Sequence, residues 1–290
     1  MLSKRVFLII AGAAMLGACS DKQSMEVYTP DKNEIVLNVL HPQQATRVTD
    51  SSFDVDDKIG VYVTQNDAEL QLAGNEVNNE PFIYKGNVWA AMRKVYWNEG
   101  QHNIYAYYPY TSDVNDIADY NFCVQTDQST DEAYTQSDFL WASAKDVEAS
   151  DNAVDMLFEH KMSRVIVMLE KGEEFEGDIP DNTEVYIYST TPYAVVDLST
   201  GDAAKNTYMS PETIKCKQLT NDTYTAIIVP QSITSQVPLV EIIIGDVSYL
   251  MYGKISFRPG YSHTMTVTLN HNPEKVKIEI GGELDDWNWK

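Results

Sequence analysis

Short apolar runs recur along most of this chain, separated by turn residues. In Thr264–Leu269 and Lys275–Ile280 every second residue is apolar, the period of a β-strand with one buried face. Gly, Pro, Asn and Asp punctuate the runs. The pattern predicts an all-β protein built from sandwiches or barrels. The other predicted strands are Ile35–Leu40, Ile59–Val63, Ile104–Tyr108, Val165–Leu169, Val185–Tyr188, Ala194–Val196, Tyr224–Val229, Leu239–Ile244 and Val247–Phe257.

Two further segments shape the expected organisation. Val165–Leu169 is apolar throughout, which predicts a central strand covered on both sides. The best helical candidate, Asp131–Ala144, is short. The stretch Ala144–Asn152 is charged and poor in large apolar residues, so we expect a domain boundary there. One domain is predicted over residues 48–150 and a second over residues 151–290.

The net charge argues against nucleic-acid binding, and the cysteines argue against a disulfide-rich or cysteine-based metal-binding protein. The 290-residue chain has a formal net charge of −22, which repels nucleic acid phosphates. Cys123 and Cys216 are too few for a disulfide framework and stand in no metal-binding spacing. Both are expected to be buried free thiols, with a single bridge between them as the minor alternative.

Aromatic residues are abundant, with 18 tyrosines and 5 tryptophans. At strand spacing they usually pack in a core or pair across strands. Exposed in a row, they would instead form a platform on which glycans stack, and packing is the favoured interpretation. The densest cluster is Trp89, Tyr96, Trp97, Tyr105, Tyr107, Tyr108 and Tyr110.

No pattern indicates catalysis, a metal or a cofactor. The five histidines are scattered, without metal-ligand spacing. Gly260–His263 lacks the second glycine of a nucleophile elbow, and a strand follows it. Asp54–Asp57 lacks the later ligands of a calcium loop, so a solvated turn is favoured. The sequence predicts a protein that is not an enzyme and binds no cofactor.

The N-terminus has the form of an export signal. Lys4 and Arg5 precede the apolar run Val6–Leu16, which is too short to span a bilayer. The following Leu16–Cys19 resembles the lipobox of bacterial lipoprotein signal peptides. The resemblance implies a signal peptide over residues 1–18 and a lipid on Cys19. The alternative is a plain secretory signal with an incidental cysteine.

Blocks along nearly the whole chain resemble the fimbrillin family of Gram-negative anaerobes, in particular its Mfa-like branch. Each block alone is weak, but their order and spacing are fairly specific. The blocks are Asp57–Val63, Val95–Trp97, Ile104–Tyr110, Ser137–Ala142, Leu157–Val165, Tyr261–Leu269 and Trp287.

The resemblance implies two transthyretin-like β-sandwich domains in tandem and a fimbrial structural, tip or accessory subunit for cell adhesion. It implies export as a lipoprotein to the outer membrane and surface fimbria. It also implies that an arginine-specific protease removes an N-terminal segment, and that the exposed groove accepts a strand from another fimbrial subunit. A host protein or glycan would be the ligand.

The residues themselves can support that mechanism. Arg47, before Val48, is the sole arginine between Arg5 and Arg93. A cut after it would remove residues 19–47, including a strand whose Ile35, Leu37 and Val39 share one face. Loss of that strand would uncover an apolar groove and unpaired backbone groups, which a strand from another chain would satisfy. The alternative is that Arg47 is a surface residue in a loop.

The C-terminus leaves two interpretations open. Val276, Ile278 and Ile280 fit a strand that is either donated to another subunit or the last strand of its own domain. The resemblance implies that members ending near a tryptophan, as here at Trp287, act as tip or accessory subunits, which need a groove but no donor tail. The alternative function is a permanently lipid-anchored surface binding module, for glycans among other ligands.

Overall fold

The computed structural model describes residues 27–40, 53–280 and 285–287. Strands dominate this part of the chain, with one α-helix, α1 (Asp131–Gln136), and one 3-10 turn, η1 (Pro273–Lys275), so the all-β prediction is confirmed. The strands are β1 (Val36–Leu40), β2 (Lys58–Gln65), β3 (Val77–Tyr84), β4 (Trp89–Ala91), β5 (Gln101–Tyr108), β6 (Tyr120–Cys123), β7 (Leu140–Glu148), β8 (Val154–Leu157), β9 (Glu159–His160), β10 (Ser163–Lys171), β11 (Glu184–Thr190), β12 (Tyr193–Val196), β13 (Ala203–Lys205), β14 (Glu212–Lys215), β15 (Lys217–Thr220), β16 (Thr223–Ile228), β17 (Gln231–Ile244), β18 (Val247–Phe257), β19 (Tyr261–Leu269), β20 (Lys277–Ile280) and β21 (Asp285–Asp286).

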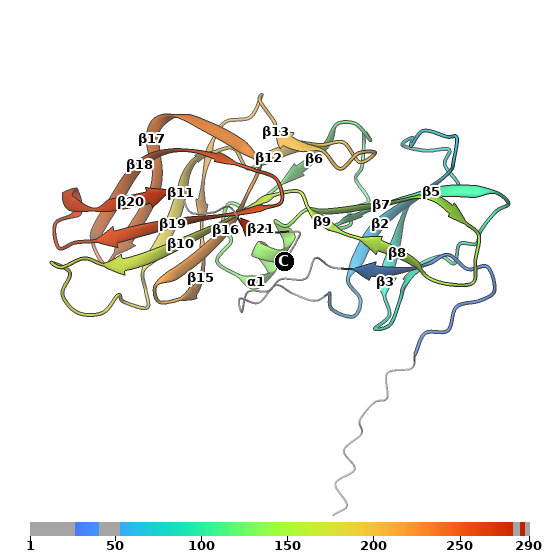
Figure 1. The fold of residues 1–290 in the computed structure, drawn as a ribbon, viewed down its shortest axis with the longest axis horizontal. Coiled ribbons are helices and arrows are strands. Elements are labelled where there is room, and N and C mark those ends of the chain that lie inside the picture. The colour runs from blue at the N-terminus through green and yellow to red at the C-terminus, as the bar shows by residue number, and fades with distance from the viewer. Residues whose placement is uncertain (1–26, 41–52, 281–284, 288–290) are drawn as a thin grey trace, which may run out of the picture.

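An eight-stranded sheet forms one end of the molecule (Figure 1). Its order is β8-β1-β4-β3-β2-β5-β7-β9, and β8 returns to contact β7, so the sheet curls around one apolar core. The inner face supplies alternate residues of the strands, as a period of two requires. These include Ile59, Val61, Phe82, Trp89 and Ile104.

Two strands of this sheet bury both faces. Ile104 of β5 faces the first core, whereas Tyr105 and Tyr107 join a second core that continues into the other end of the molecule. Tyr62 of β2 takes part in the same way. The two cores are therefore packed against opposite faces of shared strands.

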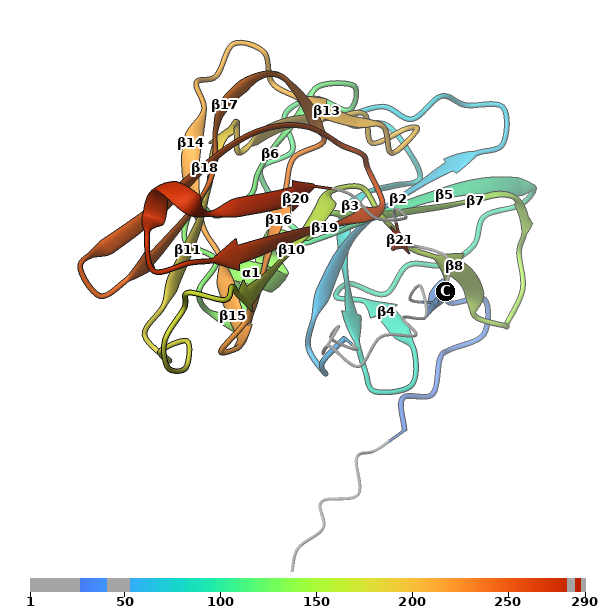
Figure 2. The same ribbon diagram turned by 60° about the vertical axis from the view of Figure 1, so that its left-hand side comes forward.

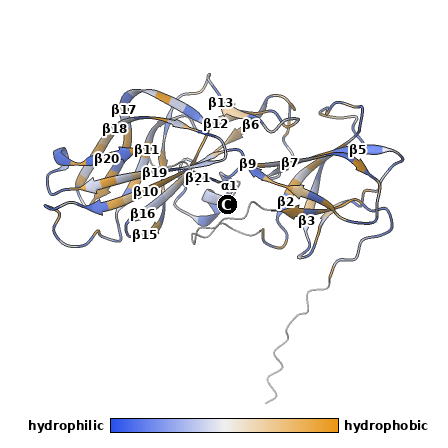
Figure 3. Ribbon diagram, viewed as in Figure 1, coloured by the Kyte–Doolittle hydropathy of each residue, from blue (hydrophilic) through white to orange (hydrophobic). Residues whose placement is uncertain are grey.

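Three further sheets enclose the second core (Figure 2). One has the order β15-β16-β10-β19-β20, with β21 also paired to β19; the others are β14-β11-β17-β18 and β13-β12-β6. Apolar segments lie mainly on the strands, and the connecting loops are hydrophilic (Figure 3).

The sheets do not separate cleanly at residue 150. The strands β8 and β9, which follow it, belong to the eight-stranded sheet, while β6, which precedes it, pairs with β12. The division into residues 48–150 and 151–290, and the tandem transthyretin-like arrangement, stay predictions.

The prediction for Val165–Leu169 is half right. This segment lies in β10, a central strand between β16 and β19. Val165, Val167 and Leu169 are buried in the second core, but Met168 is 41% exposed. Only one face of this sheet packs against the second core, so the expectation of cover on both sides is wrong.

The helix α1 ends at Gln136, and Leu140 onward forms β7, so the helical prediction to Ala144 is wrong for its second half. The Thr130 hydroxyl caps the helix by accepting a hydrogen bond from the Ala133 amide at 3.2 Å. This satisfies one of the amides that a helix N-terminus leaves without a partner.

We expect Thr130→Ala to lower the free energy of unfolding by about 1 kcal/mol, because it removes that cap. Urea unfolding followed by tryptophan fluorescence measures the effect. Thr135→Ala, inside the same helix, is the matched control and should be neutral or slightly stabilising, since alanine has the higher helix propensity. An equal loss in both variants would contradict the capping role.

Candidate functional site

The predicted removable strand is β1, and it lies inside the eight-stranded sheet. On one side it pairs antiparallel with β4, with Leu37 opposite Trp89. On the other it pairs parallel with β8, from Leu37 opposite Val154 to Leu40 opposite Leu157. Further backbone bonds join the Ile35 amide to the Val95 carbonyl and the Phe158 amide to the Leu40 carbonyl. Both edges of β1 are therefore occupied.

The alternate residues expected on one face do share a face. Ile35 and Leu37 are 1% and 0% exposed, and Val39 packs against the same first core while remaining partly exposed. An apolar strand of this length, bound along both edges, gains from burial and from backbone hydrogen bonding together. These three side chains fill a groove that the rest of the sheet forms.

Within the described residues, β1 is the sole strand that β8 pairs with. Removing β1 would therefore leave β8 without a sheet partner and β4 with one open edge. Unpaired strand edges readily accept another chain. The groove is thus a ready template for a replacement strand.

Residues that precede β1 are fixed by a polar network. Glu34 is buried, and its carboxylate accepts hydrogen bonds from the Tyr28 hydroxyl at 2.5 Å and from the Asp31 amide at 2.8 Å. Lys94 binds both Asp31, at 2.7 Å, and Glu34, at 3.2 Å. The Tyr96 hydroxyl donates to Asp31 at 3.0 Å. No sequence pattern indicates this network, because Lys94 lies about sixty positions from Asp31 and Glu34.

The network shifts the pKa values of its members. Burial by itself raises the pKa of Glu34, but hydrogen bonds from Tyr28, the Asp31 amide and Lys94 outweigh it, and the net pKa is lowered. Hydrogen bonds from Lys94 and Tyr96 lower the pKa of Asp31. Bonding to Asp31 and Glu34 raises the pKa of the Lys94 ammonium.

We expect the docking of residues 28–40 to weaken in acid. A carboxylate whose pKa is depressed on folding stabilises the fold above its unfolded pKa, and this contribution is lost as the pH falls through its folded pKa. The difference in thermal stability between wild type and Glu34→Gln should therefore be full at neutral pH and shrink as the solution is acidified below about pH 4.5. Glu99→Gln, in an exposed turn, is the control; a difference independent of pH would contradict the role of Glu34.

Three predicted residues lie outside the described part of the chain. Cys19 is within residues 1–26, and Arg47 and Val48 are within residues 41–52. Lipidation and cleavage at these positions stay predictions.

The C-terminal segment closes its own sheet. Ile278 and Ile280 lie in β20, which pairs antiparallel with β19, and Val276 packs on the same second core. Gly253 leaves room for Ile280, because a Cβ there would come within 2.7 Å of its Cδ1. In the structure this segment is the last strand of its own sheet.

Trp287 anchors the end of this segment. The pairing of β21 with β19 continues the edge that β20 occupies, and the Trp287 amide donates to the Gly260 carbonyl at 2.7 Å. Its ring stacks on His160 of β9 at 3.7 Å, and the Arg164 guanidinium lies 4.8 Å from it. The segment therefore binds both the eight-stranded sheet and the sheet that contains β10.

The aromatic cluster serves packing in most of its members. Trp89, Trp97, Tyr105 and Tyr107 are buried, whereas Tyr96 is 47% exposed. Tyr108 and Tyr110 are partly buried. The favoured interpretation is confirmed for the four buried rings, and these cannot stack on a glycan.

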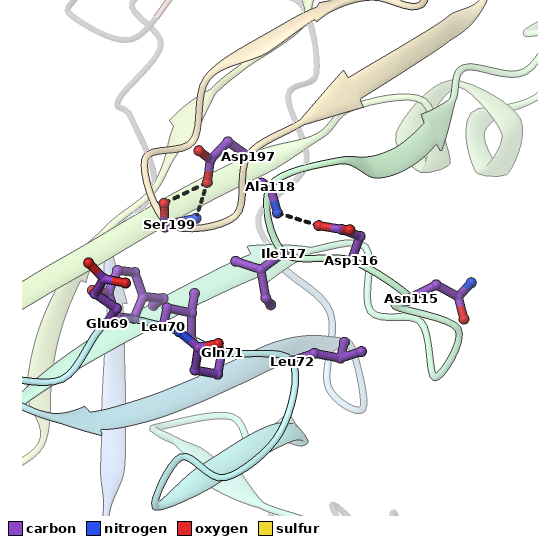
Figure 4. A pocket seen from close by; sticks show the side chains of 11 residues that line it. Glu69, Leu70, Gln71, Leu72, Asn115, Asp116, Ile117, Ala118, Asp197 and Ser199 are labelled. Carbon is purple, nitrogen blue, oxygen red and sulfur yellow. Dashed lines mark hydrogen bonds between the residues drawn. The ribbon is translucent and has the colours of Figure 1, made fainter.

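A cavity of about 600 Å³ lies away from β1, between the loops that follow β2, β5 and β12. Acidic, amide and apolar side chains line it (Figure 4). Asp197 accepts from the Ser199 amide and hydroxyl, and Asp116 accepts from the Ala118 amide. Both carboxylates thus already hold turns of the loops.

Cys123 and Cys216 are free, as expected. Cys216 is buried, which raises the pKa of its thiol, but Cys123 points outward from β6, so its predicted burial is wrong. Among the described residues no group of histidine, cysteine or acidic side chains could hold a metal ion. None of the helices described is long and apolar enough to cross a membrane.

Solved structures share this fold. A candidate cell adhesion protein from Bacteroides ovatus has a TM-score of 0.70 at 22% identity, over 88% of this chain and 96% of its own. A second, from Bacteroides uniformis, has a TM-score of 0.67 at 19% identity, over 89% of this chain and 100% of its own.

Sequence comparison assigns the family. A curated relative from Bacteroides ovatus, named as the candidate fimbrium tip subunit Fim1C, is 30% identical over 175 residues. The aligned part is 52% of this chain and 32% of the relative, so the chain spans about a third of that protein. The profile of the fimbrillin-like family, Mfa_like_1, matches residues 46–287. The chain therefore belongs to the fimbrillin-like family.

Proposed function

We propose that this chain is a fimbrial subunit for cell adhesion, exported as a lipoprotein and assembled by protease-triggered strand exchange. Residues 19–47 would fill the groove between β4 and β8 until cleavage after Arg47 releases them together with the lipid on Cys19. A strand of another fimbrial subunit would then take the place of β1.

The position of β1 carries this proposal. It is the first strand of the described residues, it pairs along both edges, and its apolar side chains fill the first core. A strand of this kind can be replaced by a peptide that offers the same backbone bonds and alternate side chains. The family profile begins at residue 46, so the shared region excludes β1. This supports a separate fate for the N-terminal segment.

The C-terminal segment favours a tip or accessory position. Its residues Val276, Ile278 and Ile280 are used within the chain, and Trp287 is 2% exposed. Donation would require releasing these contacts. We infer that the subunit accepts a strand at the cell surface, beyond the outer membrane, and keeps its own C-terminal strand.

Intact mass and N-terminal sequencing of protein from cell-surface material test the proposal. A start at Val48 without lipid is the expected result. A lipidated start at Cys19 in assembled material would overturn the cleavage step and favour the permanently anchored binding module. In that case the cavity between the β2, β5 and β12 loops would be the region to test with glycans.

A further inference from the structure

We propose that the groove selects its incoming strand by charge: Lys94 requires a carboxylate just before the alternating apolar residues. This inference rests on the strand exchange proposed above and deepens it by specifying the partner. It arises from the network around Lys94, all of which is on the side of the groove where β1 begins.

Lys94 would lose every described partner on cleavage. Its ammonium binds Asp31 at 2.7 Å and Glu34 at 3.2 Å, and it lies 5.8 Å from the ring of Tyr28. All three partners belong to the segment that cleavage after Arg47 removes. The neighbouring Arg93, by contrast, keeps its ion pair with Glu80 at 2.7 Å, because both residues belong to the retained chain.

The carboxylate of Glu34 occupies a built position. Its side chain is 0% exposed, while that of Lys94 is 43% exposed. The backbone at Glu34 bridges to Tyr96, so the position is in register with the strand that follows. A replacement strand that lacked an acid here would lose the ion pair with Lys94 at the mouth of the groove, and a basic residue at this position would bring two like charges together, which costs free energy.

Farther along the groove, the β8 side has the opposite preference. The Asn38 side-chain amide donates to Asp155 of β8 at 2.7 Å, so this carboxylate favours a hydrogen-bond donor. Asp151, at the start of the groove, accepts instead from the Asn33 backbone amide at 2.7 Å, which any residue other than proline can supply. A complementary strand that runs in the direction of β1 therefore has an acid first and then three apolar residues at alternate positions, with an amide or basic residue between the second and third apolar residues.

The chain's own C-terminal strand does not meet this requirement. Aligning Val276, Ile278 and Ile280 with Ile35, Leu37 and Val39 places Lys275 at the position of Glu34. The register that brings Glu279 there places Gly282 at the position of Leu37 and leaves that part of the core unfilled. The C-terminal strand of a second copy would therefore not satisfy Lys94, so the incoming strand belongs to a different subunit.

Peptide exchange into the cut protein tests the inference. The full chain is cleaved with an arginine-specific protease and incubated with labelled peptides, whose uptake is followed by fluorescence anisotropy. The probes are residues 27–40 of this chain, the same peptide carrying Asp31→Lys and Glu34→Lys, and residues 273–282. A peptide with Lys32→Glu tests whether a charge change away from Lys94 matters, because Lys32 has no ion pair among the described residues.

We expect the charge-reversed peptide to bind at least about tenfold more weakly than the native one, and residues 273–282 to bind more weakly as well. Lys94→Glu in the protein should weaken binding of the native peptide and strengthen binding of the charge-reversed peptide. Lys254→Glu, on the exposed side of β18, should change neither.

The outcomes separate the two proposals. Equal binding of the native and reversed peptides would overturn charge selection while leaving strand exchange intact. Failure of all the peptides to enter the cut chain would overturn strand exchange, and the charge selection with it. A weaker reversed peptide that Lys94→Glu does not rescue would place the effect outside Lys94 and would also overturn the inference.

Discussion

Replacing Arg47 with alanine is expected to leave the chain uncut and absent from fimbriae. With β1 still seated between β4 and β8, no incoming strand can reach the groove, because both edges and the apolar positions are occupied. Assembly should be lost almost completely while the amount of folded chain is preserved. Immunoblotting compares the amount of the chain in sheared surface fibres with the amount in whole cells and so measures assembly. The intact mass of the chain shows whether the N-terminal segment is retained.

The matched control is Arg93→Lys. It removes the next arginine along the chain but keeps a cation beside Glu80, so processing and assembly should remain normal. Fibres that contain the uncut Arg47→Ala chain would show that β1 need not leave, and strand exchange at this groove would then be wrong.

Replacing Leu37 with alanine is expected to destabilise the precursor but not the assembled subunit. Leu37 is 0% exposed within the first core, and truncating a buried leucine typically costs about 2–5 kcal/mol. In the processed chain residue 37 is gone, so the incoming strand alone decides how well the groove is filled. Thermal unfolding of the uncut chain and of dissociated fibre subunits measures the stability change that Leu37→Ala causes in each form.

Asn38→Ala is the control for this comparison. Its side chain is exposed and bonds to exposed Asp155, so its removal should cost about 0.5 kcal/mol or less. If Leu37→Ala destabilised fibre subunits as much as the precursor, the segment would still be present in the fibre, and the proposed release would be wrong.

Alternation was enough to predict the strands with a clean apolar face. Thr264–Leu269 folds as predicted, because one wet and one buried side leave an unambiguous period of two. Ile35–Leu40 also contains the predicted strand, although Val36 is buried on its other face. Strand β3 escaped prediction because its sequence contains Asn78, Asn79 and Pro81. Its buried Glu80 is tolerated because the amide and guanidinium of Arg93 satisfy it.

The first part of the charged stretch Ala144–Asn152, where we expect a domain boundary, forms a strand for a similar reason. Lys145 and Asp146 belong to β7, whose register with β5 continues past them to Glu148. Pairing with a long neighbouring strand overrides a weak local preference. Charge density alone therefore did not distinguish a linker from an exposed strand.

The strand that fills the groove was predictable from the sequence, but the strands that form the groove were not. The apolar face of residues 35–39 is visible in the sequence, but its partners β4 and β8 are three and four residues long and carry no periodicity. The Lys94 network joins residues far apart in the chain, and such pairings depend on the fold instead of local composition. Sequence reasoning located the strand that we propose is removed, and it missed the Lys94 network at the start of that strand.

The parallel pairing of β1 with β8 also sets an order of events during biogenesis. Asn38 contacts Asp155, 117 positions later, so β1 cannot complete its pairing until residue 157 has been synthesised. Contacts of such long separation form slowly, because a large loop must close first. A chain synthesised from its N-terminus can pair β1 with β4 early, but the β8 edge of this apolar strand stays open until residue 157 has followed, and during this interval the open edge can bind other chains or a chaperone.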